Sequence, residues 1–376
     1  MKPLSRVVPP SLTMSLDQNA KRLSAEGRDI INLTAGQVDL PMPPEGKAAI
    51  LAALEADRTG YVPAAGSADL KEAVRNRKGW TDGSILISAG AKPLLNAAVA
   101  CVLGAGDEAL LPVPCYTSYP EMIRLSGATP VPVPCRPENG FCVTPDDLLA
   151  GLTPRTKALV LNHPTNPTGA VYSRDALKGI VDLCIAHDLW ILADEVYGAF
   201  VYEGVFTSLY DFPEIRDRLI LVDSASKTYA MAGLRLGYAV APDAAAQAMA
   251  GYLSHAIGCP CSLSERAALT VLSVGDRFPT TLRDVFHARR DRMREALSNL
   301  PGIRVEGGCG AFYLWLDVTG IDSDDMRFCR RLLTEQGVAL TPGSAFSAPG
   351  FVRLAFTKDV SLLSEAANRI RRFCGE

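Results

Sequence analysis

Short apolar runs alternate with longer amphipathic stretches through the first two thirds of the chain. Runs of four or five residues rich in Ile, Leu, Val and Ala are typical of strands that are buried on both faces. Such runs predict strands at residues 85–88, 108–112, 129–133, 158–161, 190–194, 219–223 and 236–240. Residues 93–103 and 174–187 carry apolar positions at helical spacing and predict helices that cross over the sheet. This alternation indicates an α/β fold around a mostly parallel sheet.

The last quarter of the chain has a different pattern. A long helical pattern covers residues 278–300, and residues 305–376 mix short strand-like runs with helical ones. Runs of this mixed kind predict a smaller α+β unit after the large sheet. Neither internal repeats nor a low-complexity linker separate the two parts.

Composition excludes some classes of protein. With 376 residues, 48% of them hydrophobic, the chain can bury one large core or two linked ones. The formal net charge of −3 provides no basic surface for nucleic acid or membranes, and no apolar run approaches the roughly 20 residues of a membrane span. The N-terminal segment lacks the apolar core of a signal peptide, so we expect a cytoplasmic protein.

The ten cysteines are scattered through predicted helices and strands, which indicates reduced and mostly buried thiols. Cys259 and Cys261 form the one close pair, but a proline lies between them and no second pair is near. A zinc site needs about four ligands at suitable spacing, so we expect no metal.

The most informative chemical pattern is Ser224-Ala225-Ser226-Lys227, followed by Arg235 in a Gly-rich turn. Pyridoxal phosphate needs an amine for its aldehyde, and hydroxyl and guanidinium groups for its phosphate. One short loop supplies all three groups here. Taken alone, the pattern is also compatible with a solvated lysine in a surface loop.

Two upstream segments favour the cofactor. The apolar run of residues 190–193 ends in Asp194, where a carboxylate can pair with the pyridine nitrogen and keep the ring an electron sink. Tyr197 follows three residues later and can donate to the ring 3-oxygen. A rigid turn rich in Asn, Pro and Gly, residues 162–169, brings the amide of Asn166 to the same oxygen.

With these segments the chain resembles the class I aminotransferases, pyridoxal-phosphate enzymes of fold type I, and most closely their bacterial aspartate-aminotransferase-like branch. The matching segments lie at residues 32–36, 60–66, 88–92, 114–121, 162–169, 194–197, 224–238, 310–313, 342–346 and 352–354. The resemblance implies a large cofactor domain of residues 45–277 with a mostly parallel sheet. It also implies a small α+β domain built from both chain ends, residues 1–44 and 278–376.

The resemblance assigns roles at the cofactor. Lys227 would form the Schiff base and later move the substrate proton, with Asp194 and Tyr197 as its catalytic partners. The other cofactor ligands would be Ser224, Arg235, Asn166, the stacking ring of Tyr116, and the amides of Ala91 and Lys92 at a helix that Pro93 begins. Tyr61 would cross to the neighbouring subunit's phosphate, which implies a homodimer with shared active sites.

The substrate side follows in the same way. Arg353 would bind the α-carboxylate with both arms of its guanidinium, assisted by Asn166 and by the backbone N–H of Gly36. Lys92 aligns with a lysine that reaches the distal carboxylate of an acidic substrate, although a solvated helix-start lysine is an equal alternative. Residues 37–40 and 258–260 depart from the family pattern, which affects substrate choice more than chemistry.

These expectations together predict a ping-pong amino-acid:2-oxo-acid aminotransferase, with an acidic amino acid as one donor. The alternative is a pyridoxal-phosphate lyase or cyclase on the same fold, because loop geometry decides between transamination, β-elimination and cyclisation. A regulator with an aminotransferase-like sensor domain would need an added DNA-binding segment, and the sequence contains none.

Overall fold

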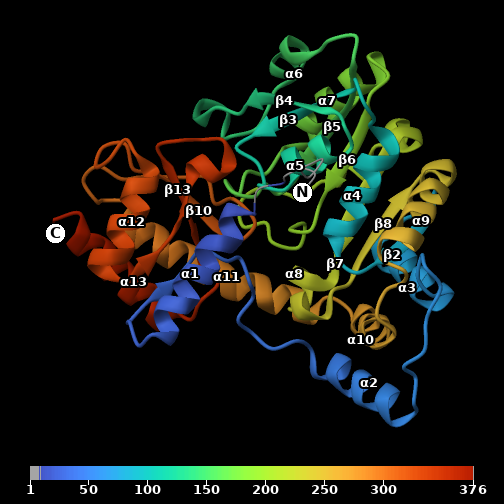
Figure 1. Cartoon of the computed structure of the whole chain (residues 1–376), viewed down its shortest axis with the longest axis horizontal. Coiled ribbons are helices and arrows are strands. Elements are labelled where there is room, and N and C mark those ends of the chain that lie inside the picture. Colours follow the sequence, from blue (N-terminus) through green and yellow to red (C-terminus); the bar gives the residue numbers. More distant parts are fainter. Residues whose placement is uncertain (1–7, 9, 376) are drawn as a thin grey trace, which may run out of the picture.

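The computed structural model describes residues 8 and 10–375 and is organised around two sheets (Figure 1). The larger sheet has the strand order β2 (Ser84–Ser88), β8 (Gly237–Ala241), β7 (Leu219–Ser224), β6 (Trp190–Asp194), β5 (Thr156–Asn162), β3 (Glu108–Val113) and β4 (Thr129–Pro134). Strands β7, β6, β5, β3 and β4 pair in parallel, and β8 is antiparallel to both of its neighbours. All seven predicted strands are present, with ends shifted by at most two residues.

Both faces of this sheet are buried, as the apolar runs predict. In β2, Ile85 and Ile87 pack into the core on one face and Leu86 into the core on the other. The first face carries α3 (Ala68–Lys78), α7 (Arg174–Ala186) and α10 (Ser262–Ser273), and the second carries α4 (Ala91–Val102), α5 (Tyr119–Leu125) and α9 (Asp243–Ala256). Helix α6 (Pro145–Gly151) packs on β4, and α2 (Pro44–Glu55) packs on α10.

The smaller sheet is antiparallel, in the order β12 (Thr341–Pro342), β13 (Phe351–Ala355), β10 (Tyr313–Asp317) and β9 (Arg304–Glu306). Its core is shared with α11 (Arg277–Leu297), α12 (Asp325–Gln336) and α13 (Val360–Phe373). The two ends of the chain meet here, because β1 (Ile31–Asn32) pairs in parallel with β11 (Val338–Ala339). Figure 1 shows the blue helix α1 (Leu12–Ala25) among the orange and red C-terminal elements.

The topology determines where a site can lie. Since β8 runs against both β2 and β7, β2 has the same direction as the remaining strands. The carboxyl ends of six strands therefore meet at one edge, which is the edge where open α/β sheets bind ligands. The predicted domain boundaries at residues 45 and 278 stay a prediction, and part of the segment 1–44 lies outside the described residues.

Two negative findings apply to the described part of the chain. No helix in it is long and apolar enough to cross a membrane. No group of three or more His, Cys, Asp or Glu side chains in it is placed to hold a metal ion.

Candidate active site

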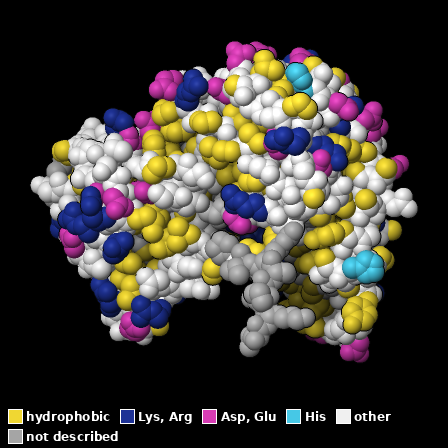
Figure 2. Space-filling view, turned by 45° about the horizontal axis from the view of Figure 1, so that its top comes forward, with side chains coloured by type: hydrophobic (Ala, Val, Ile, Leu, Met, Phe, Trp, Pro, Cys, Tyr) yellow, Lys and Arg dark blue, Asp and Glu magenta, His cyan; other side chains and the backbone are white. Residues whose placement is uncertain are grey.

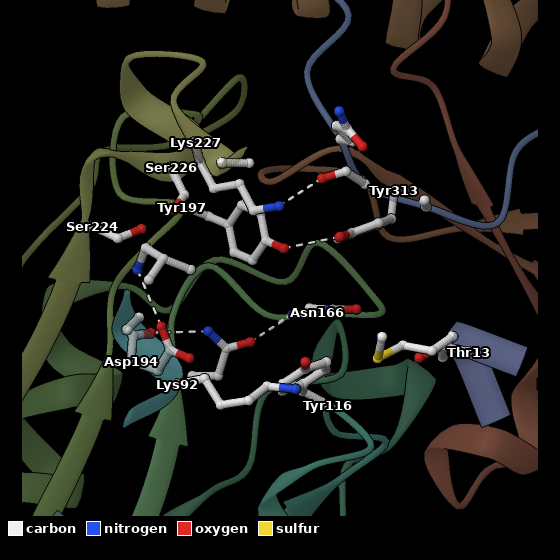
Figure 3. A pocket seen from close by; sticks show the side chains of 18 of the residues that line it. Thr13, Lys92, Tyr116, Asn166, Asp194, Tyr197, Ser224, Ser226, Lys227 and Tyr313 are labelled. Carbon is white, nitrogen blue, oxygen red and sulfur yellow. Dashed lines mark hydrogen bonds between the residues drawn. The ribbon is translucent and has the colours of Figure 1, made fainter. Parts of the chain in front are cut away.

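A cavity of about 360 Å³ lies at the carboxyl edge of the large sheet. Eleven of the twelve predicted site residues line it (Figure 3): Gly36, Ala91, Lys92, Tyr116, Asn166, Asp194, Tyr197, Ser224, Lys227, Arg235 and Arg353. They come from strand ends and loops far apart in the sequence. The prediction that these residues share one site is therefore supported by their positions.

Lys227 lies in the short helix α8 (Ala225–Thr228), directly after β7. Its Nζ donates a hydrogen bond of 2.6 Å to the carbonyl oxygen of Gly36. Burial, together with the positive charges of Arg353 and Arg235, lowers the pKa of Lys227 to about 8. A substantial fraction of this amine is neutral near pH 7.5, and the neutral form is the one that attacks an aldehyde or accepts a proton.

Asp194 ends β6 with its carboxylate buried beside the cavity. Its oxygens accept hydrogen bonds from the Tyr119 hydroxyl at 2.6 Å and from the backbone N–H of Val196 at 3.2 Å. Burial nevertheless raises the pKa of Asp194 to about 6. A buried carboxylate with so few donors favours a cationic partner, and a protonated pyridine nitrogen is such a partner.

Arg353, on β13, is almost fully buried and tightly oriented. One Nη donates to Asn166 Oδ1 at 2.7 Å, and the other donates to the carbonyl oxygen of Thr34. The guanidinium carbon lies 4.3 Å from the ring centroid of Tyr313 and 4.7 Å from that of Phe346. Its Nε has no partner among the described residues. A planar guanidinium held this way is preorganised for a carboxylate.

The geometry at Asn166 differs in one respect from the sequence expectation. Its Oδ1 is taken by Arg353, so the side chain links the arginine to the cofactor side of the cavity. Its Nδ2 has no hydrogen-bond partner within the described chain and remains able to donate. The turn of residues 162–169 is stabilised by a further hydrogen bond, in which Asn162 Oδ1 accepts from the Asn166 backbone N–H at 2.7 Å.

The start of α4 is a candidate anion site. The backbone N–H groups of Ala91 and Lys92 have no side-chain cap, so they point outward from the positive helix end. A Cβ on Gly90 would lie 2.5 Å from Arg235 Nη2, and one on Gly237 would lie 2.4 Å from the Ala91 nitrogen. Only glycine at these two positions leaves room for Arg235 beside Gly90 and for the start of α4 beside Gly237. The guanidinium and the backbone N–H groups can therefore both donate hydrogen bonds to one anion.

One detail of this helix was predicted wrongly. Pro93 is its third residue rather than its first, because the helix begins at Ala91. Proline is tolerated there because the N–H groups of the first turn have no acceptor within the helix. The helix starts two residues earlier than predicted, so the backbone N–H groups of Ala91 and Lys92 belong to its first turn.

These groups fit pyridoxal phosphate on the evidence of the cavity itself. The cavity is lined by a lysine with a lowered pKa, a buried carboxylate and a guanidinium. The uncapped helix start and the hydroxyls of Ser224 and Ser226 line it as well. That cofactor needs an amine for its aldehyde, a carboxylate to pair with its pyridine nitrogen, and hydrogen-bond donors for its phosphate dianion.

Two predicted residues have special positions. Lys92 Nζ lies 5.3 Å from the ring centroid of Tyr116, and both side chains line the cavity. Tyr61 is 99% exposed and is the one predicted residue that the cavity of this chain does not include. Its role in a neighbouring subunit stays a prediction.

Several cavity residues escaped the sequence reasoning. Tyr313 hydrogen-bonds Tyr197 at 2.8 Å between hydroxyls, and a Cβ on Gly36 would lie 2.0 Å from the Tyr313 hydroxyl oxygen. The segment 310–313 was recognised as a motif without a role, so the signal was present. By contrast, nothing in the sequence marked Thr13 and Met14, which α1 brings into the cavity.

A group of charges behind the cavity was also missed. Lys78 forms an ion pair with the buried Asp223, one residue before Ser224. Burial raises the pKa of the neighbouring Glu195 to about 8, so that carboxyl is mostly protonated at pH 7. The negative charge of Asp223 also acts on Asp194, whose pKa it raises, whereas the positive charge of Lys227 lowers that pKa.

The sheet and its cavity together define a pyridoxal-phosphate enzyme of fold type I. Comparison with known proteins gives the family. The family model described as aminotransferase class I and II matches residues 28–370. The chain therefore belongs to the class I and II aminotransferases.

Individual relatives agree over nearly the whole chain. An aspartate/prephenate aminotransferase of Cereibacter sphaeroides is 36% identical over 386 residues, covering 98% of this chain and 96% of that protein. An aspartate aminotransferase of Geobacillus stearothermophilus is 34% identical, covering 97% and 96%. The structure of Thermus thermophilus aspartate aminotransferase with maleate matches with a TM-score of 0.95 at 35% identity, covering 99% of this chain and 100% of that one.

The chain is thus a pyridoxal-phosphate-dependent aminotransferase whose substrates are amino acids and 2-oxo acids. The predicted fold class, cofactor and enzyme class are confirmed. The alternative of a lyase or cyclase is not favoured, because the named relatives are aminotransferases.

Proposed function

We propose that this aminotransferase takes its amino group from an acidic amino acid, aspartate or glutamate, and passes it to a 2-oxo acid in a second half-reaction. One observation carries the proposal: Arg353 and Lys92 both face the cavity that holds Lys227. Two cationic groups around one reacting amine suit a dicarboxylate. The names of the relatives, which are aspartate or aspartate/prephenate aminotransferases, support the same substrate class.

Bound pyridoxal phosphate supplies an aldehyde that takes up the amino group and a ring that withdraws electrons from the substrate α-carbon. Arg353 binds the α-carboxylate and so fixes the direction of the α-hydrogen. Lys227, as a free amine, would take this proton and return it to the aldehyde carbon of the cofactor, two bonds from the α-carbon. The pKa of about 8 allows Lys227 both to accept and to release the proton near neutral pH.

The other residues hold this arrangement. The carboxylate of Asp194 would stabilise a protonated pyridine nitrogen, and the Asn166 amide and Tyr197 hydroxyl would bind the ring 3-oxygen. The start of α4 and Arg235 would neutralise the phosphate, assisted by the hydroxyl of Ser224, which lines the same cavity. The ring of Tyr116 would stack on the cofactor ring.

Lys92 decides the acidic part of the proposal, because residues 254–262 contain no arginine that could bind the distal carboxylate. Replacing Lys92 with Ala is expected to lower kcat/KM for aspartate and glutamate by about 1–3 kcal/mol of transition-state binding, the loss of one charge-assisted hydrogen bond. Leucine should lose little, since it has no distal charge. Steady-state kinetics with the three donors measure the difference, and equal losses on all three would contradict the role.

A half-reaction screen tests the substrate class directly. Amino acids are mixed one at a time with the cofactor-loaded enzyme, and conversion to the pyridoxamine form is followed by absorbance. We expect aspartate and glutamate to convert the enzyme fastest. The reverse direction is screened with 2-oxoglutarate, oxaloacetate and prephenate, the last because related proteins carry its name. If neither aspartate nor glutamate converts the enzyme, the proposal of an acidic donor is wrong, and only the general assignment as an aminotransferase remains.

We also propose a homodimer in the cytoplasm, with active sites shared between subunits. A second cavity of about 710 Å³ adjoins the first and shares Lys92 and Arg235 with it. Its walls are largely apolar and include Leu12, Leu125 and Ile257, each of which is partly exposed. Figure 2 shows bands of hydrophobic side chains between charged ones on one face of the molecule. An apolar surface beside the phosphate site and the fully exposed Tyr61 fit a second copy of the chain.

The dimer is tested by sedimentation and by Tyr61→Phe. We expect a dimer at micromolar concentration, because an active site built from two chains requires one. Tyr61→Phe should keep the dimer and weaken pyridoxal phosphate binding by about 1 kcal/mol, the value of one hydrogen bond. A monomeric enzyme with full activity would contradict the shared site.

A further inference from the structure

The strand ends of the large sheet carry polar side chains on both faces. Ser224 and Asp194 lie at the cavity (Figure 3), on the face that carries α4 and α5. Consecutive residues of a strand point to opposite faces, so Asp223 and Glu195 lie on the other face, beside α3. The candidate cofactor site therefore has a second polar layer behind it, separated from the cavity by the sheet.

Lys78 supplies the positive charge of this layer. It is the last residue of α3, and its Nζ forms an ion pair with Asp223 Oδ2. The Asp223 side chain is 4% exposed and that of Lys78 is 32% exposed. The ring centroids of Trp80 and Tyr238 lie 6.0 Å and 5.9 Å from the same Nζ. Water screens such a pair little, so removal of one partner leaves the charge of the other uncompensated.

The other titratable groups that face the pair are neutral or have partners of their own: Glu195, Tyr229, Tyr238 and Arg77. The raised pKa of Glu195 keeps that carboxyl mostly protonated at pH 7. Burial raises the pKa of Tyr238 well above its usual value, so its hydroxyl also stays neutral. Arg77 forms an ion pair with the exposed Asp276 and donates to the Tyr229 hydroxyl at 3.3 Å. The charge balance behind the sheet therefore depends on Lys78 and Asp223.

Asp223 is connected to the cavity by a hydrogen bond and by its charge. Its Oδ1 accepts from the backbone N–H of Ser224 at 2.6 Å, and Ser224 lines the cavity. The charge of Asp223 also acts on Asp194, which accepts from the Tyr119 hydroxyl and experiences the positive charge of Lys227. An unpaired charge at Asp223 would therefore change the proton equilibria inside the cavity.

We propose that Lys78 and Asp223 are positioning residues of the cofactor site, and that their ion pair keeps its strand ends electrically balanced from the opposite face of the sheet. This inference rests on the proposed function, because it takes Asp194 and Ser224 as cofactor ligands. Loss of Lys78 leaves one negative charge behind the site, which favours protonated groups in the cavity. Loss of Asp223 leaves one positive charge, which favours deprotonated groups there.

The test follows the visible absorbance of the bound cofactor against pH, because its midpoint reports the proton on the link between cofactor and Lys227. Lys78→Met should raise this midpoint by about 0.5 to 1 pH unit, and Asp223→Asn should lower it by about as much, on the scale of one unpaired charge at roughly 10 Å. Asparagine keeps an oxygen that accepts from the Ser224 N–H, so the second change removes charge alone.

Three further variants serve as controls. Lys78→Arg keeps the positive charge and should match the parent. The double variant Lys78→Met/Asp223→Asn removes both charges and should also lie near the parent. Lys178→Met removes a lysine from an exposed pair with Asp182 on α7 and should leave the midpoint unchanged.

The order of the midpoints decides the outcome. The proposal requires Lys78→Met above the parent and Asp223→Asn below it, and any other order overturns it. A merely structural role would disturb the site in both single variants alike and move both midpoints in one direction. If Lys78→Met does not fold, Asp223→Asn must lie below both Lys78→Arg and the double variant, and equal midpoints would overturn the proposal.

Ser224→Ala and Asp194→Asn separate this inference from the proposed function. If they change the affinity or the absorbance of the bound cofactor while the required order is absent, the proposed function stands without the ion pair. If neither variant changes the bound cofactor, the assignment of these cofactor ligands is itself wrong.

Discussion

Replacing Lys227 with Ala is expected to lower transamination by about four orders of magnitude or more. Under the proposed function, the change removes both the amine that binds the cofactor aldehyde and the base that moves the α-proton, and general base catalysis alone contributes up to about 10⁴-fold. Cofactor binding should persist, because the uncapped start of α4 and Arg235 do not depend on the lysine side chain. Single-turnover absorbance measurements with an acidic donor give the rate.

The control for this variant is Lys157→Ala, which removes an exposed lysine paired with Asp107 on the same sheet. It should retain full activity and the same cofactor affinity. Retention by Lys227→Ala of a borohydride-reducible link to the cofactor, together with parent-like turnover, would show that another lysine holds the cofactor.

Asp194→Ala is expected to slow proton abstraction by about two to four orders of magnitude while the fold remains intact. Under the proposed function, the carboxylate holds the ring nitrogen protonated, and without it the ring withdraws electrons poorly. Stopped-flow absorbance of the first half-reaction measures the step. Near-parent rates in this variant would remove the electron-sink role of Asp194.

The pKa of Asp194 adds a stability control to this experiment. Burial raises this pKa from 3.8 to about 6 in the folded chain, so the ionised carboxylate costs stability as pH rises from 3.8 to 6 and continues to cost it at pH 7. Asp194→Asn should therefore not lower the melting temperature of the cofactor-free protein at pH 7. A clear loss of stability there would contradict the stability cost assigned to the ionised carboxylate.

The sequence predicted the large sheet well because its strands are buried on both faces and form continuous apolar runs. The same criterion missed β1, β11 and β12, which have only two residues each and no periodicity to detect. The direction of β8 was also invisible, because antiparallel and parallel buried strands share one apolar pattern.

The candidate site divides in the same way. Lys227 and Asp194 were predicted because each lies in a local motif whose chemistry can be read from neighbouring residues. Arg353 was predicted from the resemblance to the aminotransferases. The contacts between them were not, since the Arg353 bond to Asn166 joins residues 187 positions apart and its bond to Thr34 spans 319. Helix α1 carried no motif at all, and only the folded chain brings it to the cavity.

The pairing of Ser224 with Gly237 closes the loop that contains Lys227 and Arg235 at its base. Every strand of the large sheet, and with it the cofactor lysine, its aspartate and the helix start, is therefore complete once residue 241 has left the ribosome. Arg353 follows more than a hundred residues later and must find Thr34, near the other end of the chain. During synthesis, the ability to bind cofactor should therefore precede the ability to bind the substrate carboxylate through Arg353.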